Sequence, residues 1–315
     1  MRKLIYIALL VLAIAGLGVL AFLGPAHLQI RGITPALPDV AELLALRDVA
    51  DGPVSLESLT VATQEYPRGT GGHAVFLARW ADGRAFMIDA GMDRAQAADF
   101  AELMATLGGA GEARFLGDVA EQLGPTIRDV SGVGFTHLHI DHTQGLGVFC
   151  AARGSGATVY QTRWQAEVHN RNTTAGAAIV RDSCLTPAVI DGEGLHPVDG
   201  FPGLGMVALG GHTPGSTLFA LAVDDRLWLF SGDITNSKAD LLADVGKGFL
   251  YSAILVPENT ARTAELRRWL TSLDARDDTT VIVSHDIQDT ARHLPAFDAA
   301  ESASTPPTRE SLRGR

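Results

Sequence analysis

The sequence predicts an α+β fold in which helices cover a large β-sheet or a pair of sheets. Two observations support this fold class: strand-like and helix-like patterns alternate along most of the 315 residues, and 46% of the residues are hydrophobic. The chain contains 34 glycines and 14 prolines but only 6% aromatic residues, which is typical of a globular chain rich in loops. These values exclude a disordered, collagenous or coiled-coil chain for most of the length.

Strand-like runs occur throughout the chain after about residue 59. The first two runs, residues 73–80 and 86–89, flank Asp82-Gly83, a dipeptide typical of a β-hairpin turn. The later runs are residues 130–135, 158–161, 206–209, 217–223, 227–230 and 280–283.

Two helices are indicated within residues 100–107 and 266–273, where apolar side chains recur at i, i+3, i+4 and i+7. Such a stripe is typical of a helix that lies on a sheet.

The N-terminus predicts an exported protein. Residues 4–23 form an uncharged, mostly apolar run, which as a helix is long enough to cross a hydrocarbon core of about 30 Å. Arg2 and Lys3 precede the run, so the positive-inside rule keeps residues 1–3 in the cytoplasm. We therefore expect a membrane anchor, with the folded part facing the periplasm or another extracytoplasmic space.

Cleavage of this run as a signal peptide is the alternative, and it would release a secreted protein. Val19-Leu20-Ala21 and Gly24-Pro25-Ala26 both offer small residues at suitable spacing for a signal peptidase. Residues 24–58, with their prolines and a short helical pattern over residues 40–46, predict a linker. Residues 59–298 are expected to form the folded domain, and residues 299–315 a disordered tail.

Charge and cysteine content restrict the partners and the compartment. The formal net charge of -11 argues against nucleic acid as a partner, because no general positive field is present to neutralise phosphates. Cys150 and Cys184 are too few for a disulfide scaffold. In an oxidising space they can form one disulfide, and two buried thiols are the alternative.

The strongest chemical signal is the string F-T-H-L-H-I-D-H over residues 135–142, directly after a predicted strand. Imidazole and carboxylate groups are ligands that zinc accepts readily. His137 and His139 can converge on one ion, while Asp141 and His142 turn toward a second. Four such residues within six positions predict metal binding far better than satisfied polar residues at a strand end.

Three further segments supply the remaining ligands. His212 lies in the turn G-G-H-T-P-G-S after a predicted strand and completes the first site. Asp233 ends the strand 227–230, and its two carboxylate oxygens can bridge two ions. His285 follows the apolar strand 280–283 and completes the second site.

With these residues the chain resembles a hydrolase of the metallo-β-lactamase superfamily over roughly residues 59–297. Met87-Ile88-Asp89-Ala90-Gly91 is similar to the first motif of that family, in which the Asp orients a ligand loop. The string at residues 137–142 matches the second motif. His212, Asp233 and His285 match the third, fourth and fifth motifs.

This resemblance implies a four-layer αβ/βα sandwich, in which two mixed sheets carry two ions in a groove at one edge. It also implies two Zn²⁺ per chain, with iron or manganese as alternatives. Two such ions share a hydroxide that attacks the carbonyl group of a small-molecule lactone, ester or lactam. Asp141 is the candidate catalytic residue, placed to steer this nucleophile or to pass on its proton.

The substrate stays open. Ser284-His285-Asp286-Ile287-Gln288 resembles homoserine-lactone-degrading lactonases, but the tyrosine that follows the bridging Asp in those enzymes is absent here, with Asn236 nearby. β-Lactamases of subclass B3 share the histidine string but lack the bridging Asp. A β-lactamase proper and a di-iron redox member of the same fold are the alternatives, and an inactive binding module is disfavoured because no ligand is missing.

Other residues are assigned ordinary roles. His27, His169, His196 and His293 have no ligand neighbours at suitable spacing. His73 follows two glycines, and a structural role and contact with substrate both stay open.

We expect loops 163–186 and 235–252 to select the substrate. Within the second loop, Lys238, Lys247 and Tyr251 are each candidates to hold a carboxylate or an oxyanion, and we expect the two lysines on the solvated surface instead. The oligomeric state is not predicted.

Overall fold

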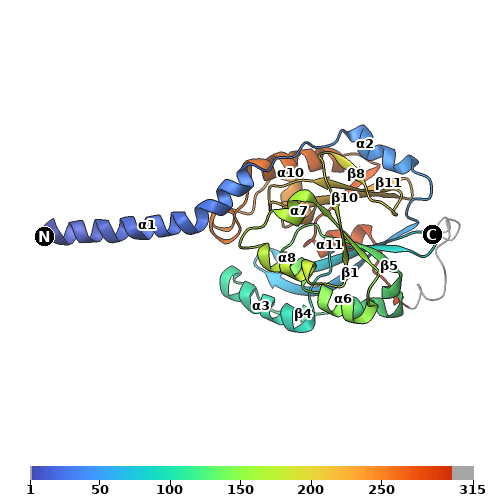
Figure 1. The fold of residues 1–315 in the computed structure, drawn as a ribbon, viewed down its shortest axis with the longest axis horizontal. Helices are drawn as coiled ribbons and strands as arrows, with labels where there is room; N and C mark the ends of the chain where they lie inside the picture. Colours follow the sequence, from blue (N-terminus) through green and yellow to red (C-terminus); the bar gives the residue numbers. More distant parts are fainter. Residues whose placement is uncertain (1, 300–315) are drawn as a thin grey trace.

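Two mixed β-sheets lie face to face in the computed structural model, which describes residues 2–299 (Figure 1). The first sheet consists of β1 (Ser55–Tyr66), β2 (Gly69–Arg79), β3 (Ala85–Ile88), β4 (Ala113–Phe115), β5 (Val130–Gly134), β6 (Thr158–Thr162) and β7 (Thr186–Ile190). The second consists of β8 (Leu195–Pro197), β9 (Leu204–Ala208), β10 (Thr217–Val223), β11 (Arg226–Phe230) and β12 (Thr279–Ile282). Their strand orders are β4-β1-β2-β3-β5-β6-β7 and β12-β11-β10-β9-β8.

Parallel pairing aligns the strand ends that later carry the site. β3, β5, β6 and β7 run parallel to one another, as do β11 and β12, whereas the remaining pairs are antiparallel. The carboxyl ends of neighbouring parallel strands meet at the same edge of a sheet. Loops that leave β3 and β5 therefore start side by side, as do those that leave β11 and β12.

An aromatic layer fills the space between the two sheets. Phe76 and Phe86 from the first sheet lie in one apolar cluster with Phe219 and Phe230 from the second. The rings of Phe76 and Phe230 are 4.5 Å apart. Gly134 allows this close approach, because a Cβ atom there would lie 2.3 Å from the Phe219 ring. This interdigitated packing holds the sheets in one relative position.

Helices cover the outer face of each sheet and complete a four-layer sandwich, which confirms the predicted fold class. The helices over the first sheet are α4 (Val119–Leu123), α6 (Leu146–Arg153) and α8 (Thr174–Arg181). Those over the second sheet are α2 (Val40–Leu44), α9 (Lys238–Leu242) and α10 (Thr260–Asp274). The other helices are α1 (Arg2–Arg31), α3 (Arg94–Gly108), α5 (Ile140–Thr143), α7 (Arg163–Glu167) and α11 (Ile287–His293).

The strands and helices predicted from sequence are present, whereas β1, β4, β7 and β8 are additional. The alternating pattern of β1 is interrupted because its register with β2 shifts between Thr60 and Ala62. Pro187 and exposed side chains give β7 the pattern of an edge strand. The expected loops 163–186 and 235–252 contain the short helices α7, α8 and α9.

Much of the expected linker, residues 24–58, is packed against the domain. α1 extends to Arg31, Ile30 is fully buried, and Leu43 joins the apolar cluster beneath the second sheet. These apolar residues lie too far apart in sequence to form a periodic pattern, so the sequence predicts a linker there. Apart from residue 299, the tail expected over residues 299–315 lies outside the described residues.

α1 protrudes from the domain in Figure 1 and is, within residues 2–299, the one helix long and apolar enough to cross a membrane. Its last turns contact the domain, since His27 Nε2 lies 2.9 Å from the Ala253 carbonyl oxygen and Gln29 donates to the His169 carbonyl at 3.1 Å.

The structure joins Cys150 of α6 to Cys184 in a disulfide across 34 residues. Loop closure of this length favours the folded state chiefly by restricting the unfolded chain.

We predict that the double variant Cys150→Ser/Cys184→Ser loses about 4 kcal/mol of unfolding free energy. The measurement is urea denaturation of the full chain in detergent. A reducing agent should lower the wild-type midpoint and leave that of the variant unchanged. Equal midpoints for the oxidised wild type and the variant would contradict the contribution assigned to this bond.

Candidate metal centre

Seven predicted ligand residues meet at one edge of the two facing sheets. They lie at the carboxyl ends of strands from both sheets, where loops or short helices begin. His137 and His139 follow β5, Asp141 and His142 lie on α5, His212 follows β9, Asp233 follows β11, and His285 follows β12. Residues separated by up to 148 positions in sequence (285 minus 137) thus come together in space.

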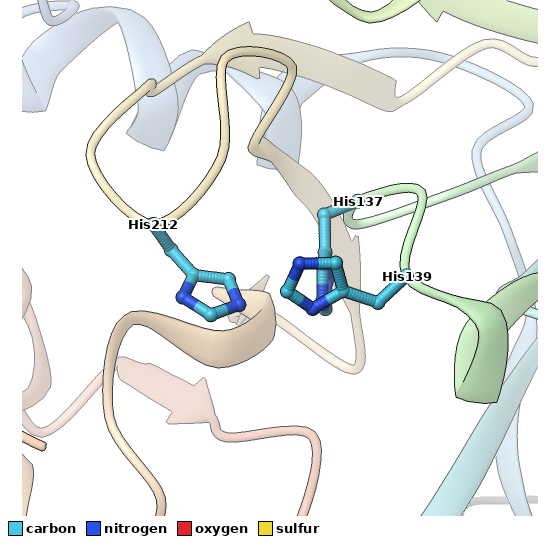
Figure 2. Close-up of side chains that lie close together, drawn as sticks. All are labelled: His137, His139 and His212. Carbon is cyan, nitrogen blue, oxygen red and sulfur yellow. The ribbon is translucent and has the colours of Figure 1, made fainter. Parts of the chain in front are cut away.

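The first cluster consists of His137, His139 and His212, with one ring nitrogen of each within 4.8 Å of the others. Figure 2 shows the three imidazole rings close together, with His212 on a different loop from the other two. His137 Nε2 and His139 Nδ1 are 3.0 Å apart. Ligands about 2.1 Å from a tetrahedral ion lie roughly 3.4 Å apart, so this spacing suits a shared cation.

The second cluster combines two carboxylates and two imidazoles. His285 Nε2 lies 3.0 Å from Asp233 Oδ1 and 3.6 Å from Asp141 Oδ2. His142 Nε2 lies 3.7 Å and 3.5 Å from the same two oxygens. Four ligand atoms therefore surround one point, as a second cation would require.

Asp233 lies between the two clusters. Its Oδ1 atom contacts the second cluster, while its Oδ2 atom lies 4.0 Å from His137 Nε2 and 3.7 Å from His212 Nε2 in the first. The Oδ2 atom also lies 3.1 Å from His285 Nε2, so the Asp233 carboxylate contacts both clusters, which is the arrangement expected for a bridging ligand.

Hydrogen bonds on the opposite ring nitrogens orient three of the imidazoles. His142 Nδ1 lies 2.9 Å from Asp89 Oδ2, His212 Nδ1 lies 2.6 Å from Glu258 Oε1, and His285 Nδ1 lies 2.8 Å from the Gly72 carbonyl. An acceptor at Nδ1 keeps the proton there and leaves Nε2 free to bind a metal. The same partners hold each ring in a fixed position.

Glu258 was not singled out from the sequence, although it is buried and holds both His212 and the Ser252 hydroxyl. No local motif marks it, because it reaches the site only through the fold. Asp89, by contrast, lies in the motif M-I-D-A-G and accepts hydrogen bonds from the Thr136 backbone and hydroxyl, each at 2.8 Å.

Unpartnered buried atoms show that the residues present fit a metal. His142 Nε2, His212 Nε2 and Asp233 Oδ1 are buried without a hydrogen-bond partner. Such atoms are costly in a folded protein unless an ion or water satisfies them. A mixed set of imidazole and carboxylate ligands suits zinc, and it also suits iron or manganese.

Burial and neighbouring charges shift the pKa values of the histidine ligands in opposite directions. Burial lowers the pKa of His137, His139 and His212, so these rings are neutral and ready to bind a cation. Burial also acts to lower the pKa of His142, but the carboxylates of Asp89 and Asp141 outweigh it and raise that pKa to about 10. Metal binding must therefore release a proton from His142.

Two lysine side chains differ from their expected surroundings. Lys247, expected on the solvated surface, has a side chain only 1% exposed, and its Nζ lies 3.2 Å from Asp233 Oδ2 and 5.1 Å from the centre of the Tyr251 ring. Lys238 is also largely buried and pairs with Asp274 at 2.7 Å. Both lysines leave solvent because buried carboxylates attract them.

His73 reaches the site, which the sequence left open. Its Nδ1 lies 3.3 Å from Asp141 Oδ2, and its ring packs against Phe100 and His285. The other four histidines lie outside the ligand clusters. Their contacts are with the Ala253, Ala166 and Glu193 carbonyls for His27, His169 and His196, and with the Asp289 carboxylate for His293.

The sequence profile of the metallo-beta-lactamase superfamily matches residues 68–285, which include all seven ligand residues. The chain belongs to this superfamily. Comparison with curated proteins finds no match.

Several solved structures share the fold at low sequence identity. An N-acyl homoserine lactone hydrolase, solved with its product N-hexanoyl-L-homoserine at the catalytic metal centre, has a TM-score of 0.57 and 14% identity, covering 78% of this chain and 98% of its own. A probable metal-dependent hydrolase from Staphylococcus aureus has a TM-score of 0.53 and 16% identity over 74% and 90% of the two chains. A dizinc quorum-quenching lactonase has a TM-score of 0.51 and 15% identity over 74% and 88%. Family, fold and ligand clusters support a metal-dependent hydrolase.

Gly176 on α8 packs against the backbone of the loop that carries His137 and His139. A Cβ atom there would lie 2.1 Å from the Leu138 carbonyl oxygen, between His137 and His139. We predict that Gly176→Ala displaces this loop and weakens zinc affinity about tenfold. Gly147 on α6 is the matched control, because a Cβ there meets nothing within 4 Å. Competition with a chromophoric chelator measures both affinities, and equal values for the two variants would contradict this role of Gly176.

Asp89→Asn should weaken zinc binding by a factor of about 10 to 100. The asparagine amide can accept from the Thr136 backbone, but it then presents an NH₂ group to His142 Nδ1. That contact favours the tautomer with the proton on Nε2, which cannot bind a metal. Chelator competition with the purified variant checks this, and affinity equal to wild type would show that Asp89 does not set the tautomer.

Proposed function

We propose that the protein is a binuclear zinc hydrolase that opens a carbonyl compound, a lactone, ester or lactam. The observation that carries this proposal is the position of Asp233, whose carboxylate lies against both ligand clusters. A single structural zinc has a closed set of four ligands and leaves no reason for a shared carboxylate between two clusters. Two adjoining sites are typical of hydrolytic chemistry.

Lactones are the first substrate class to test. Solved structures with this fold include N-acyl homoserine lactone hydrolases. Because the sequence identity is low, this similarity concerns the fold and not the substrate. The tyrosine that the resemblance to lactonases implies soon after the bridging Asp is absent, with Asn236 nearby in sequence. Tyr251 brings a phenol close to Asp233, since its ring lies against Lys247, which contacts that carboxylate. A hydrogen-bond donor to the substrate is therefore available from a different part of the sequence.

Divalent ions bound here would supply an activated water and polarise the carbonyl oxygen of the substrate. Asp141 lies beside His142 and His285, so its carboxylate is placed to orient the attacking water. His73 Nδ1 lies 3.3 Å from the same Asp141 oxygen and helps to hold the carboxylate in position. In the reaction the water oxygen bonds to the carbonyl carbon, the bond to the leaving oxygen or nitrogen breaks, and a proton passes to that leaving atom.

Lys247 and Tyr251 are placed to bind the developing negative charge. Burial acts to lower the pKa of Lys247, but Asp233 raises it above its usual value, so the amine stays protonated. Burial raises the pKa of Tyr251, so its phenol keeps the proton that it can donate. A cation and a neutral donor at one point suit an oxyanion.

We further propose that α1 stays attached as a membrane anchor, with the domain on the periplasmic or extracytoplasmic side. α1 continues through both candidate cleavage sites, and its residues after position 21 contact the domain through Phe22, His27 and Gln29. Cleavage after Ala26 would separate Phe22 from His27 and Gln29. Against cleavage after Ala21 stands the length of the apolar run over residues 4–23, which exceeds the roughly 7 to 15 residues of a usual signal-peptide core. The Cys150–Cys184 disulfide supports an oxidising compartment.

The test is acid release from a panel of lactones, β-lactams, thioesters, carboxyl esters and phosphodiesters, using the full chain in detergent with added zinc. We expect turnover of lactones or esters. Asp141→Asn should reduce kcat by a factor of about 10² to 10⁴ while the protein stays folded, because a positioned carboxylate typically contributes that much.

The control is Asp99→Asn, an exposed residue of α3 outside the ligand clusters, which should keep full activity. Undiminished turnover by Asp141→Asn would contradict the role given to Asp141. No turnover of any compound by the zinc-loaded wild type would overturn the proposed hydrolysis, and elemental analysis for iron would then test the redox alternative.

A further inference from the structure

We propose that residues 249–255 rest on the membrane surface and that the substrate is an amphiphile with an acyl chain, taken from the bilayer. This inference rests on the proposed anchor and deepens the proposed hydrolysis. It starts from an apolar rim, defined here as Phe249, Leu250, Ile254 and Leu255. Their side chains are exposed by 80%, 68%, 46% and 42%.

The apolar rim lies where α1 leaves the domain. His27 of α1 contacts the Ala253 carbonyl, and the Arg171 guanidinium lies 4.7 Å from the centre of the Phe22 ring while donating to the Ile254 carbonyl. In Figure 1 the orange segment around residue 250 lies beside the base of α1. The end of α1 and the segment that carries the apolar rim are therefore adjacent.

The distance along α1 places this rim at the depth of the lipid headgroups. If residues 4–23 fill the hydrocarbon core, His27 is four residues beyond it, or about 6 Å at 1.5 Å per residue. Amphipathic segments that lie in a membrane interface bury their apolar side chains about 5 to 10 Å into it. Four large apolar side chains within seven residues at that depth fit lipid as their partner.

The net charge of the protein indicates that the rim binds the membrane through its apolar side chains and not through electrostatic attraction. The net charge of -11 repels anionic lipids, so without an anchor the domain would not be attracted to a membrane that contains them. The attached α1 removes this obstacle, because it holds the apolar rim at the bilayer permanently. Arg171, between Phe22 and the rim, is suited to the headgroup level.

Residues 247–252, which overlap this segment, also form part of the metal centre. Lys247 contacts Asp233, the Tyr251 ring lies under Lys247, and Ser252 donates to Glu258, which holds His212. One short stretch thus has lipid-facing side chains and site-facing side chains. A substrate with its acyl chain in the bilayer would meet Lys247 and Tyr251 with its carbonyl end, which is the reason for the substrate class proposed.

The position of the rim is tested without any activity measurement. Phe249→Cys and the control Val40→Cys are each labelled with an environment-sensitive fluorophore in the full chain, reconstituted into phospholipid vesicles. The chain's own cysteines are joined in a disulfide, so one thiol reacts. Val40 is also exposed but lies on α2, far from the protruding part of α1 in Figure 1.

Nitroxide groups on the lipids should quench the label at position 249 and leave that at position 40 unquenched. Equal quenching at the two positions, or none at position 249, would overturn the proposal. Phe249 is 80% exposed, so its replacement leaves the core intact.

The substrate class is tested with Phe249→Ser/Leu250→Ser against Val40→Ser. For a long-chain acyl lactone in vesicles, the double variant should lose roughly tenfold in kcat/KM. For a short-chain, water-soluble lactone, both variants should match wild type. An equal loss on both substrates, or on neither, contradicts delivery from the bilayer. If the wild type hydrolyses neither lactone while the label at position 249 is still quenched, the proposed hydrolysis is contradicted and the membrane position of the rim is retained.

Discussion

The buried carboxylate of Asp233 is the constraint on which the site depends. It lies within 4.0 Å of imidazole nitrogens from His137, His212 and His285 and within 3.2 Å of the Lys247 amine. An ionised group in the interior must be paired, because leaving one unpaired costs several kcal/mol. The loops that follow β5, β9 and β12, and the segment that carries Lys247, are therefore held around the end of β11.

The two sheets give this carboxylate its neighbours. His137 comes from the first sheet, whereas Asp233 and His285 come from the second, so the site exists only while the sheets keep their relative position. Gly232 lets the loops approach closely, since its φ is +60° and a Cβ there would lie 2.8 Å from the Thr136 side chain. The aromatic layer and these contacts together preorganise the ligands, which is what metal binding at two adjoining sites requires.

Sequence alone predicts the ligands because their chemistry is local. Histidines and aspartates at strand ends stand out against apolar runs, and the strands themselves follow from periodicity. His73, Glu258 and Lys247 are different: each reaches the site through long-range packing, and a lone polar residue in a loop has the same local pattern whether it is buried or solvated. The bulge in β1 is not predicted because it interrupts the strand period, and the packing of residues 24–58 is not predicted because the short helical pattern over residues 40–46 does not indicate what it packs against.

Equilibrium dialysis against zinc, followed by elemental analysis, tests the central claim most directly. The account predicts two zinc ions per wild-type chain, with Asp233→Asn losing tight binding at both positions because its carboxylate faces both clusters. Fewer than two ions in the wild type, or two ions held by Asp233→Asn with unchanged affinity, would contradict a centre organised around this carboxylate.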